Sequence, residues 1–160
     1  MAKKVKIKKT LVEQILSKAG VPHQGIQLNA LEGELPQDYE RDQIFKTLAL
    51  LGDKTGPIIG IVPITEHLAE KKLAKVSGNK KVSMIPQKDL EKTTGYIHGA
   101  NNPVGIRQKH NYPIFIDQTA LDLDQMIVSA GEVGHSIIIR PRDLASFVKA
   151  NFADILEESK

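Results

Sequence analysis

The chain reads IFKTLALL at residues 44–51, DKTG at residues 53–56 and PIIGIV at residues 57–62. Both apolar runs have the length of a β-strand and consist largely of β-branched or large apolar residues. The polar tetrapeptide between them contains glycine and is typical of a tight turn. We therefore predict a β-hairpin with strands at 44–51 and 57–62.

The segments around this hairpin alternate between helix and strand patterns. Before it, Thr10 and Glu13 match a capping box, which predicts a helix that begins after Thr10 and stops at Gly20. Residues 20–38 are rich in Gly, Asn and Pro, which predicts a loop with room for one short strand. After the hairpin we expect helices at 66–76, 86–95 and 141–148, and strands at 82–84, 114–116, 126–129 and 136–140. This order predicts an α+β fold with a curled, mostly antiparallel sheet.

Composition limits the class of protein. At 160 residues the chain fits one domain, which we place at residues 10–157 behind a basic N-terminal tail at residues 1–9. It has no Cys, which excludes disulfides, thiolate metal sites and a cysteine nucleophile, and which is compatible with a cytoplasmic location. No apolar run approaches the ~20 residues that cross a bilayer, so no membrane segment is expected. The net charge of +3 is too small to indicate nucleic-acid binding by itself.

A glycine-rich segment, TTGYIHGANNPVG at residues 93–105, is the second informative feature. Its three glycines and its proline disfavour both helix and sheet, so we expect a loop. Successive N–H groups in such a loop can grip a carbonyl oxygen or an anion. An ordinary surface turn is the alternative interpretation.

Two polar side chains stand in strand-like surroundings. Lys46 interrupts an apolar pattern, and a half-buried ammonium needs a partner or a ligand. The alternative is a lysine that reaches solvent from an edge strand. Ser129 lies where the predicted strand runs into a small-residue turn, so its hydroxyl can bind a substrate or its own backbone.

Several kinds of site lack support. The five histidines show no i,i+3 or i,i+4 pairing, and no phosphate-binding loop, dinucleotide-binding motif or G-x-S-x-G sequence is present. We therefore expect no metal site and no cofactor. The sequence also offers no convincing protein nucleophile or general base. With aromatic residues at 4% and no Trp, a stacking platform for single-stranded nucleic acid is not expected.

Four motifs together resemble one family: FKTL at 45–48, TTGYIHGANNPVG at 93–105, IVSAG at 127–131 and NFADI at 151–155. It is the YbaK/EbsC family of aminoacyl-tRNA deacylases, which is related to the editing domain inserted in bacterial prolyl-tRNA synthetases. The likeness covers residues 10–155 in matching order. It implies a single editing domain with a six-stranded, barrel-like mixed sheet surrounded by helices.

The chain departs from the family pattern at two places. Residues 21–28 lack a tyrosine that relatives carry, and an acidic residue expected after Ser129 is replaced around His135 and Ser136. Both places border the expected pocket, so they concern amino-acid specificity more than the fold.

The resemblance also implies a pocket for the 3′-terminal adenosine of a tRNA and its esterified amino acid. Lys46, Gly99 and Ala100 are the candidate catalytic residues: the lysine would position the ester and the loop would grip its carbonyl oxygen. The candidate substrate-binding residues are Tyr96, His98, Asn101, Asn102, Pro103, Ser129 and Gly131.

The activity implied is the deacylation of mischarged Cys-tRNA(Pro), with Cys-tRNA(Cys) as a further substrate and with the substrate thiol or a bound water as the attacking group. The implied partners are the mischarged tRNA and prolyl-tRNA synthetase, and the oligomeric state is left open. Candidate contacts to tRNA phosphates are Lys71, Lys72, Lys75, Lys80, Lys81 and the lysines of the N-terminal tail. Two alternatives stay open: a non-catalytic module that binds RNA or a synthetase, and a deacylase for another mischarged tRNA such as Ala-tRNA.

Overall fold

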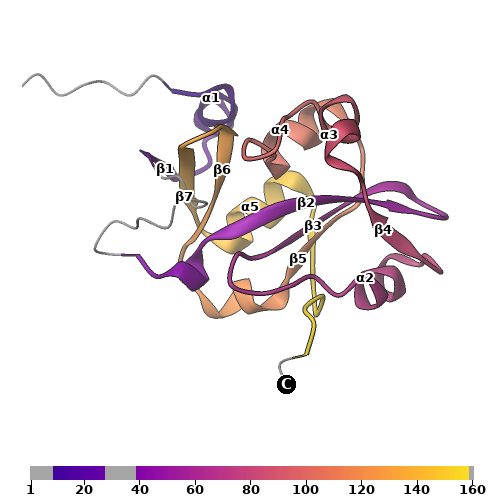
Figure 1. Cartoon of the computed structure of the whole chain (residues 1–160). Coiled ribbons are helices and arrows are strands. Elements are labelled where there is room, and N and C mark those ends of the chain that lie inside the picture. The colour runs from indigo at the N-terminus through magenta and orange to yellow at the C-terminus, as the bar shows by residue number, and fades with distance from the viewer. Residues whose placement is uncertain (1–8, 28–38, 159–160) are drawn as a thin grey trace, which may run out of the picture.

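The computed structural model describes residues 9–27 and 39–158 (Figure 1). Of the predicted basic tail, only Lys9 lies within the described residues. Leu28, the last residue of the segment that lacks the tyrosine, also lies outside them. The described α-helices are α1 (Leu11–Lys18), α2 (Glu70–Ser77), α3 (Gln87–Thr94), α4 (Pro103–Lys109) and α5 (Pro141–Val148), with 3-10 turns η1 (Arg41–Gln43) and η2 (Gln118–Asp122). The described strands are β1 (His23–Gln27), β2 (Phe45–Gly52), β3 (Gly56–Pro63), β4 (Val82–Met84), β5 (Ile114–Asp117), β6 (Met126–Glu132), β7 (His135–Ile139) and β8 (Asn151–Ala153).

The predicted hairpin is confirmed and forms the middle of the larger sheet. Strands β2 and β3 pair antiparallel from Phe45 opposite Pro63 to Gly52 opposite Gly56. The sheet has the order β4-β2-β3-β5-β8, in which β3, β5 and β8 run parallel to one another. Strand β4 pairs with β2 only over Leu50–Gly52. The first half of β2 is therefore an edge, and this edge will carry the candidate site.

A second, three-stranded sheet has the order β1-β7-β6 and is antiparallel throughout. It confirms one short strand, β1, within the segment predicted to be mostly loop. The two sheets touch through a parallel bridge between Ile44 and Ile127. Because the described strands divide between a five-stranded and a three-stranded sheet without closing, the single six-stranded barrel-like sheet is not confirmed.

Apolar packing on the two faces of β2 fixes how this strand lies. Phe45 and Ala49 join the larger core cluster, which also takes side chains from α1, α4, α5 and the inner face of the smaller sheet. Leu50 on the other face joins a second cluster under α2. Figure 1 shows α3 and α4 on one side of β2 and α2 on the opposite side. The strand backbone is thus held from both faces.

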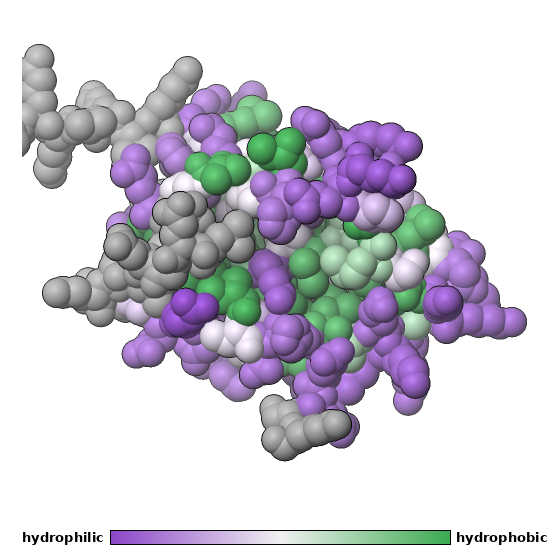
Figure 2. All heavy atoms as spheres, in the orientation of Figure 1, coloured by the Kyte–Doolittle hydropathy of each residue, from purple (hydrophilic) through white to green (hydrophobic). Residues whose placement is uncertain are grey.

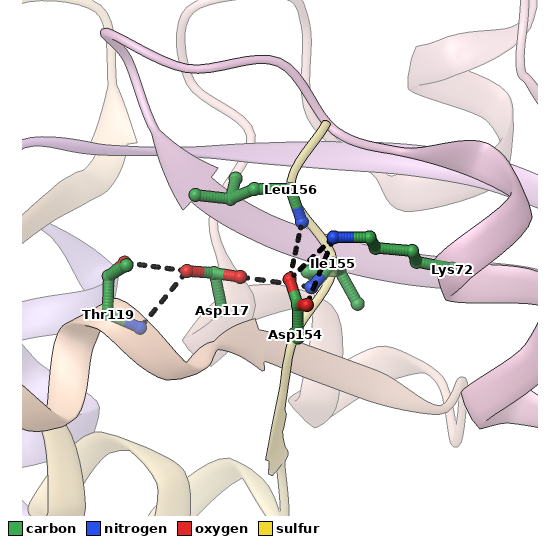
Figure 3. A network of polar contacts seen from close by, with 6 residues as sticks. All are labelled: Lys72, Asp117, Thr119, Asp154, Ile155 and Leu156. Carbon is green, nitrogen blue, oxygen red and sulfur yellow. Dashed lines mark hydrogen bonds and ion pairs between the residues drawn. The ribbon is translucent and has the colours of Figure 1, made fainter. Parts of the chain in front are cut away.

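The C-terminal strand is held by carboxylates (Figure 3). Asp117, which is buried, accepts hydrogen bonds from the Thr119 N–H and hydroxyl, and from the Ile155 N–H at 3.0 Å. Next to it, Lys72 of α2 forms an ion pair with Asp154 at 3.0 Å. These contacts fix the chain after β8 against the larger sheet.

The loop predicted over residues 93–105 is shorter in the structure, since its first two residues belong to the helix predicted at 86–95 and its last three begin an unpredicted helix. Thr93 and Thr94 form the last turn of α3, and Pro103 begins α4. Asn102 caps α4 by accepting a 2.6 Å hydrogen bond from the Gly105 N–H, and proline is well tolerated at the first helical position because it needs no donor there. The signals that predicted a loop instead mark the start of a helix.

The other predicted elements agree with the structure within a few residues. Thr10 caps α1 by accepting from the Glu13 N–H at 3.2 Å, as predicted for that half of the capping box. Helix α2 begins at Glu70 and not at Glu66. Strand β8 was not predicted. No helix in the described ranges is long and apolar enough to cross a membrane.

Candidate functional site

A cavity of about 540 Å³ lies along the edge of β2 that β4 leaves uncovered. Two bonds reach this edge from outside the sheet. The Asn101 side chain donates to the Thr47 carbonyl at 3.0 Å, and the Ile85 N–H donates to the Ala49 carbonyl at 3.1 Å. Figure 2 shows apolar side chains over β2 on this face, with hydrophilic residues around them. The cavity therefore combines an apolar wall with a strand edge whose Thr47 and Ala49 carbonyls are bonded from outside the strand pairing.

The charged side chains that line this cavity are Arg41 and Lys46, and both are cations. No carboxylate from the described residues lines it. Such a cavity favours anionic groups and developing negative charge. Arg41 escaped the sequence analysis, because it lies before the strand pattern and its position depends on η1. Neither here nor in the rest of the described ranges does a group of three or more histidines and carboxylates lie close enough to hold a metal ion.

Five of the predicted site residues line the cavity: Lys46, His98, Gly99, Asn101 and Ser129. They come from β2, the segment between α3 and α4, and β6, so only the tertiary fold brings them together. Tyr96, Ala100, Asn102, Pro103 and Gly131 do not line it. Their predicted contacts with a ligand stay predictions, and the structure gives several of them a supporting position.

Lys46 is half-buried at the cavity, and burial lowers the pKa of its ammonium below the ordinary 10.5. No carboxylate in the described ranges forms an ion pair with it. Its strand position also places it on a second, mixed-charge recess, which Lys71, Glu70 and Glu157 line as well. A cation that is partly desolvated and lacks a counter-ion is well suited to receive an anionic ligand group.

The turn at residues 97–100 presents a backbone amide. The Ala100 N–H donates to the Ile97 carbonyl at 3.0 Å and is therefore engaged within the turn. Gly99 has a φ of +90°, as the third residue of such a turn requires, and glycine adopts it without strain. No described residue accepts a hydrogen bond from the Gly99 N–H. Between the two predicted amides, Gly99 is the one left available to a ligand.

Asn102, Tyr96 and Gly131 hold this turn from behind. Asn102 donates to the Ala100 carbonyl at 3.0 Å while it caps α4. A side chain at Gly105 would overlap the Tyr96 ring and hydroxyl, and one at Gly131 would lie 3.3 Å from the Asn102 amide nitrogen. The Lys109 ammonium lies 4.9 Å from the centre of the Tyr96 ring, a cation–π contact. Close packing thus fixes the position of the Gly99 amide.

The position of Ser129 is compatible with both interpretations of its sequence, a bond to its own backbone and a contact with a ligand. Its hydroxyl accepts a hydrogen bond from the Gly131 N–H at 3.2 Å, which ties the turn to its own backbone. The same residue lines the cavity, opposite Ser136 of β7. A hydroxyl can accept more than one hydrogen bond and donate another, so the backbone contact leaves its donor free for a ligand.

Three buried side-chain atoms in the described ranges have no hydrogen-bond partner, and all belong to residues that line this cavity. They are Thr47 Oγ1, Asn101 Oδ1 and His135 Nδ1. Each such atom costs about 1–3 kcal/mol, and native proteins contain few of them. Their concentration at one cavity is what a binding site for a polar ligand requires. Thr47 belongs to the FKTL motif and His135 to the departure noted after Ser129, but neither was among the predicted site residues.

Comparison with known proteins gives a consistent result. A family model described as the aminoacyl-tRNA editing domain matches residues 34–147. The Enterococcus faecalis protein EbsC, named as a candidate Cys-tRNA(Pro)/Cys-tRNA(Cys) deacylase, is 38% identical over 162 residues, which cover 97% of this chain and 98% of that protein.

Solved structures share the fold at lower identity. One is described as a candidate trans-editing enzyme for prolyl-tRNA synthetase. It has a TM-score of 0.80 and 22% identity, and the match covers 92% of this chain and 95% of that chain. Another, from work on epitope grafting onto scaffold proteins, has a TM-score of 0.81 and 23% identity over 92% of this chain and 96% of that chain. At these identities the likeness supports the fold alone.

Proposed function

Since this chain belongs to the family of aminoacyl-tRNA editing domains, we propose that it is a trans-editing deacylase that removes cysteine from mischarged tRNA(Pro), with Cys-tRNA(Cys) as a further substrate. The observation that carries the proposal is the cavity shared by Lys46, Gly99 and Ser129. The nearly full-length likeness to EbsC supports the same substrate class.

The ester bond of an aminoacyl-tRNA is cleaved through a tetrahedral oxyanion. The Gly99 N–H is the donor that this chain offers to that charge, and one well-placed donor contributes about 10²–10³ in rate. Lys46 binds a phosphate or the ribose of the terminal adenosine and so orients the ester towards the turn. Its contribution is positioning and charge, because an ammonium that stays protonated is a poor proton acceptor.

The attacking group comes from the substrate or from water in this proposal. No carboxylate from the described residues lines the cavity, whereas two cations and two histidines, His98 and His135, do line it. Nearby cations lower the pKa of a thiol and raise its thiolate fraction. The cysteinyl thiolate attacks its own carbonyl carbon, the C–O bond to the ribose breaks, and the ribose oxygen takes a proton. The products are tRNA and a cyclic thioester, so by this route the enzyme acts as a lyase; attack by water makes it a hydrolase.

The lysines that were predicted to contact tRNA differ in their surroundings. Lys72 is engaged with Asp154, whereas Lys71 borders the recess that also contains Lys46. Glu70 and Glu157 line that recess too, but no described carboxylate forms an ion pair with Lys71, so we favour Lys71 over Lys72 as a contact for a phosphate next to the terminal adenosine. Association with prolyl-tRNA synthetase and a cytoplasmic location are parts of the same proposal.

The test is a deacylation panel with cysteinyl-, alanyl-, seryl- and prolyl-tRNA. We expect turnover of cysteinyl-tRNA that Lys46→Ala abolishes and that Lys54→Ala, a change at an exposed turn, leaves intact. Faster turnover of alanyl-tRNA would reassign the substrate. Binding without turnover of any of the four would favour a non-catalytic module.

A further inference from the structure

Two buried oxygens, which belong to residues that line the cavity, have hydrogen-bonding capacity that the described residues leave unused. Thr47 and Asn101 are 9% and 7% exposed, and Thr47 Oγ1 and Asn101 Oδ1 have no partner in the described ranges. The bond from Asn101 Nδ2 to the Thr47 carbonyl fixes the amide orientation, because the flipped amide would place two oxygens against each other. It also keeps both unpartnered oxygens in the same region.

The chemistry of the two atoms defines what they can bind. Asn101 Oδ1 only accepts, whereas the Thr47 hydroxyl can donate or accept. A ligand group that satisfies both atoms can donate one hydrogen bond and accept another. The surrounding charges narrow the choice, because Arg41 and Lys46 line the cavity without a described carboxylate. These cations disfavour an ammonium and favour a neutral group.

An aminoacyl-adenosine carries two groups of this kind, its α-amine in the neutral form and the hydroxyl of its ribose. An α-amine has a reference pKa of about 7.7–8.0, and neighbouring cations lower it further. The neutral amine is therefore accessible near neutral pH. A ribose hydroxyl is neutral at any pH of interest.

We propose that Thr47 and Asn101 form a polar recess that binds a neutral donor–acceptor group of the esterified substrate, either its α-amine or a ribose hydroxyl. The inference rests on the function proposed above and adds two specificity-determining residues to it. Asn101 is two residues from Gly99, so a group bound in the recess fixes the ester at a set distance from the turn amide. Thr47 and Lys46 are neighbours on β2, so their side chains leave opposite faces of the strand, and the recess contacts a different part of the ligand from the ammonium.

The test measures binding, so that it does not depend on hydrolysis. Calorimetry with 3′-cysteinylamino-3′-deoxyadenosine, whose amide link resists cleavage, compares wild type with Thr47→Val and Thr47→Ser. Valine keeps the shape of threonine without the hydroxyl, and we expect about tenfold weaker binding. Serine keeps the hydroxyl, so Thr47→Ser is expected to retain most of the wild-type affinity. Thr65→Val, at an exposed turn outside the cavity, serves as the control.

Two further ligands identify the group. One lacks the α-amine (3-mercaptopropionyl in place of cysteinyl), and the other lacks the ribose 2′-hydroxyl. Thr47→Val and wild type should bind equally well to the ligand that lacks the recognised group. A structural role alone would not give this pattern, because removal of an unpartnered buried hydroxyl should leave Tm unchanged or raised.

Two negative results are distinguishable. If wild type binds the cysteinyl ligand and Thr47→Val binds it equally tightly, the recess is overturned while the proposed function stands. If wild type binds none of the ligands, the proposed function fails and the recess with it.

Discussion

Asn101 donates a 3.0 Å hydrogen bond from its side-chain amide to the backbone carbonyl of Thr47, 54 residues earlier in the chain. The bond takes the place of a neighbouring strand at the open edge of β2. It therefore links the turn that contains Gly99 to the strand that carries Lys46. The relative position of the two predicted catalytic groups depends on this contact.

Replacement of Asn101 by Ala should separate those groups. The change leaves the Thr47 carbonyl without its donor, and we expect the free energy of unfolding to fall by about 1–2 kcal/mol. Turnover of cysteinyl-tRNA should fall at least tenfold, because small displacements of positioning groups are costly. Urea unfolding and single-turnover deacylation measure the two effects. Turnover that falls only in proportion to the folded fraction would show that the bond is merely structural.

Replacement of Lys46 by Met should separate activity from stability. Burial disfavours the charged ammonium in the folded state and lowers its pKa, so the unfolded chain binds that proton more tightly. The charged ammonium of Lys46 therefore destabilises the folded state at any pH below its lowered pKa. This destabilisation disappears as the pH rises from that lowered pKa to the ordinary value of 10.5. Lys46→Met should raise Tm at neutral pH by about 1–2 °C and abolish turnover.

The same titration gives a pH dependence for wild type. Binding of the amide-linked cysteinyl ligand should weaken as the pH rises through the lowered pKa of Lys46, and this weakening should be absent from Lys46→Met. Titration calorimetry from neutral to alkaline pH measures it. Equal pH profiles for the two proteins would exclude a contact between the ammonium and the ligand.

A methyl group at Gly105 should be tolerated only if Tyr96 is removed. The added Cβ of Gly105→Ala overlaps the Tyr96 ring, and such overpacking costs about 1–3 kcal/mol. With Tyr96→Ala the overlap disappears, and Ala exceeds Gly in helix propensity by up to about 1 kcal/mol. The effect of Gly105→Ala should therefore change sign between the two backgrounds. Chemical denaturation of the four proteins tests this, and additive effects would contradict it.

The two carboxylates near the C-terminal strand should differ in how much they contribute to the free energy of unfolding. Asp117 is buried and accepts from three donors, so Asp117→Asn places an amide donor among donors and should cost about 2–3 kcal/mol. Asp154 is exposed, and its hydrogen bond with Lys72 lowers the pKa of its carboxyl. The contribution of Asp154 is present above its unfolded pKa and lost as the pH falls through the lowered value.

Asp154→Asn should accordingly change stability only slightly at neutral pH, because exposed ion pairs contribute little. Equilibrium unfolding of both variants at neutral and acidic pH makes the comparison. A larger loss from Asp154→Asn than from Asp117→Asn would reverse the assignment of which carboxylate holds the strand.

Local patterns predicted the elements whose formation depends on neighbours in sequence. The hairpin of β2 and β3 follows from two apolar runs and a turn, and α1 follows from its Thr10 cap. Strand β8 escaped prediction because its three residues form a strand only by pairing with β5. Helix α4 escaped because Pro103 and Gly105 resemble loop residues until Asn102 is recognised as a cap.

The candidate site was predictable in part, where its residues lie in recognisable local motifs. Lys46, Gly99 and Ser129 lie in motifs that carry a family resemblance, and the fold places them on one cavity. Arg41 lies in no such motif, and His135 was noted only as a departure from the family pattern; the meeting of η1, β2 and β7 brings both residues to that cavity. The division into two sheets also depends on long-range pairing that alternation along a strand does not encode.

The cationic lining of the cavity favours the route in which the cysteinyl thiolate of the substrate is the nucleophile. Cysteinyl-tRNA should be cleared at least about 10²-fold faster than seryl-tRNA, because a thiol forms far more of its anion than a hydroxyl near neutral pH. The rate with cysteinyl-tRNA should rise with pH as the thiolate forms. Arg41→Ala removes one lining cation, so it should move that rise to higher pH by raising the pKa of the bound thiol. Rates measured over a pH series with both tRNAs provide the check. Equal rates for cysteinyl- and seryl-tRNA would instead assign the attack to water.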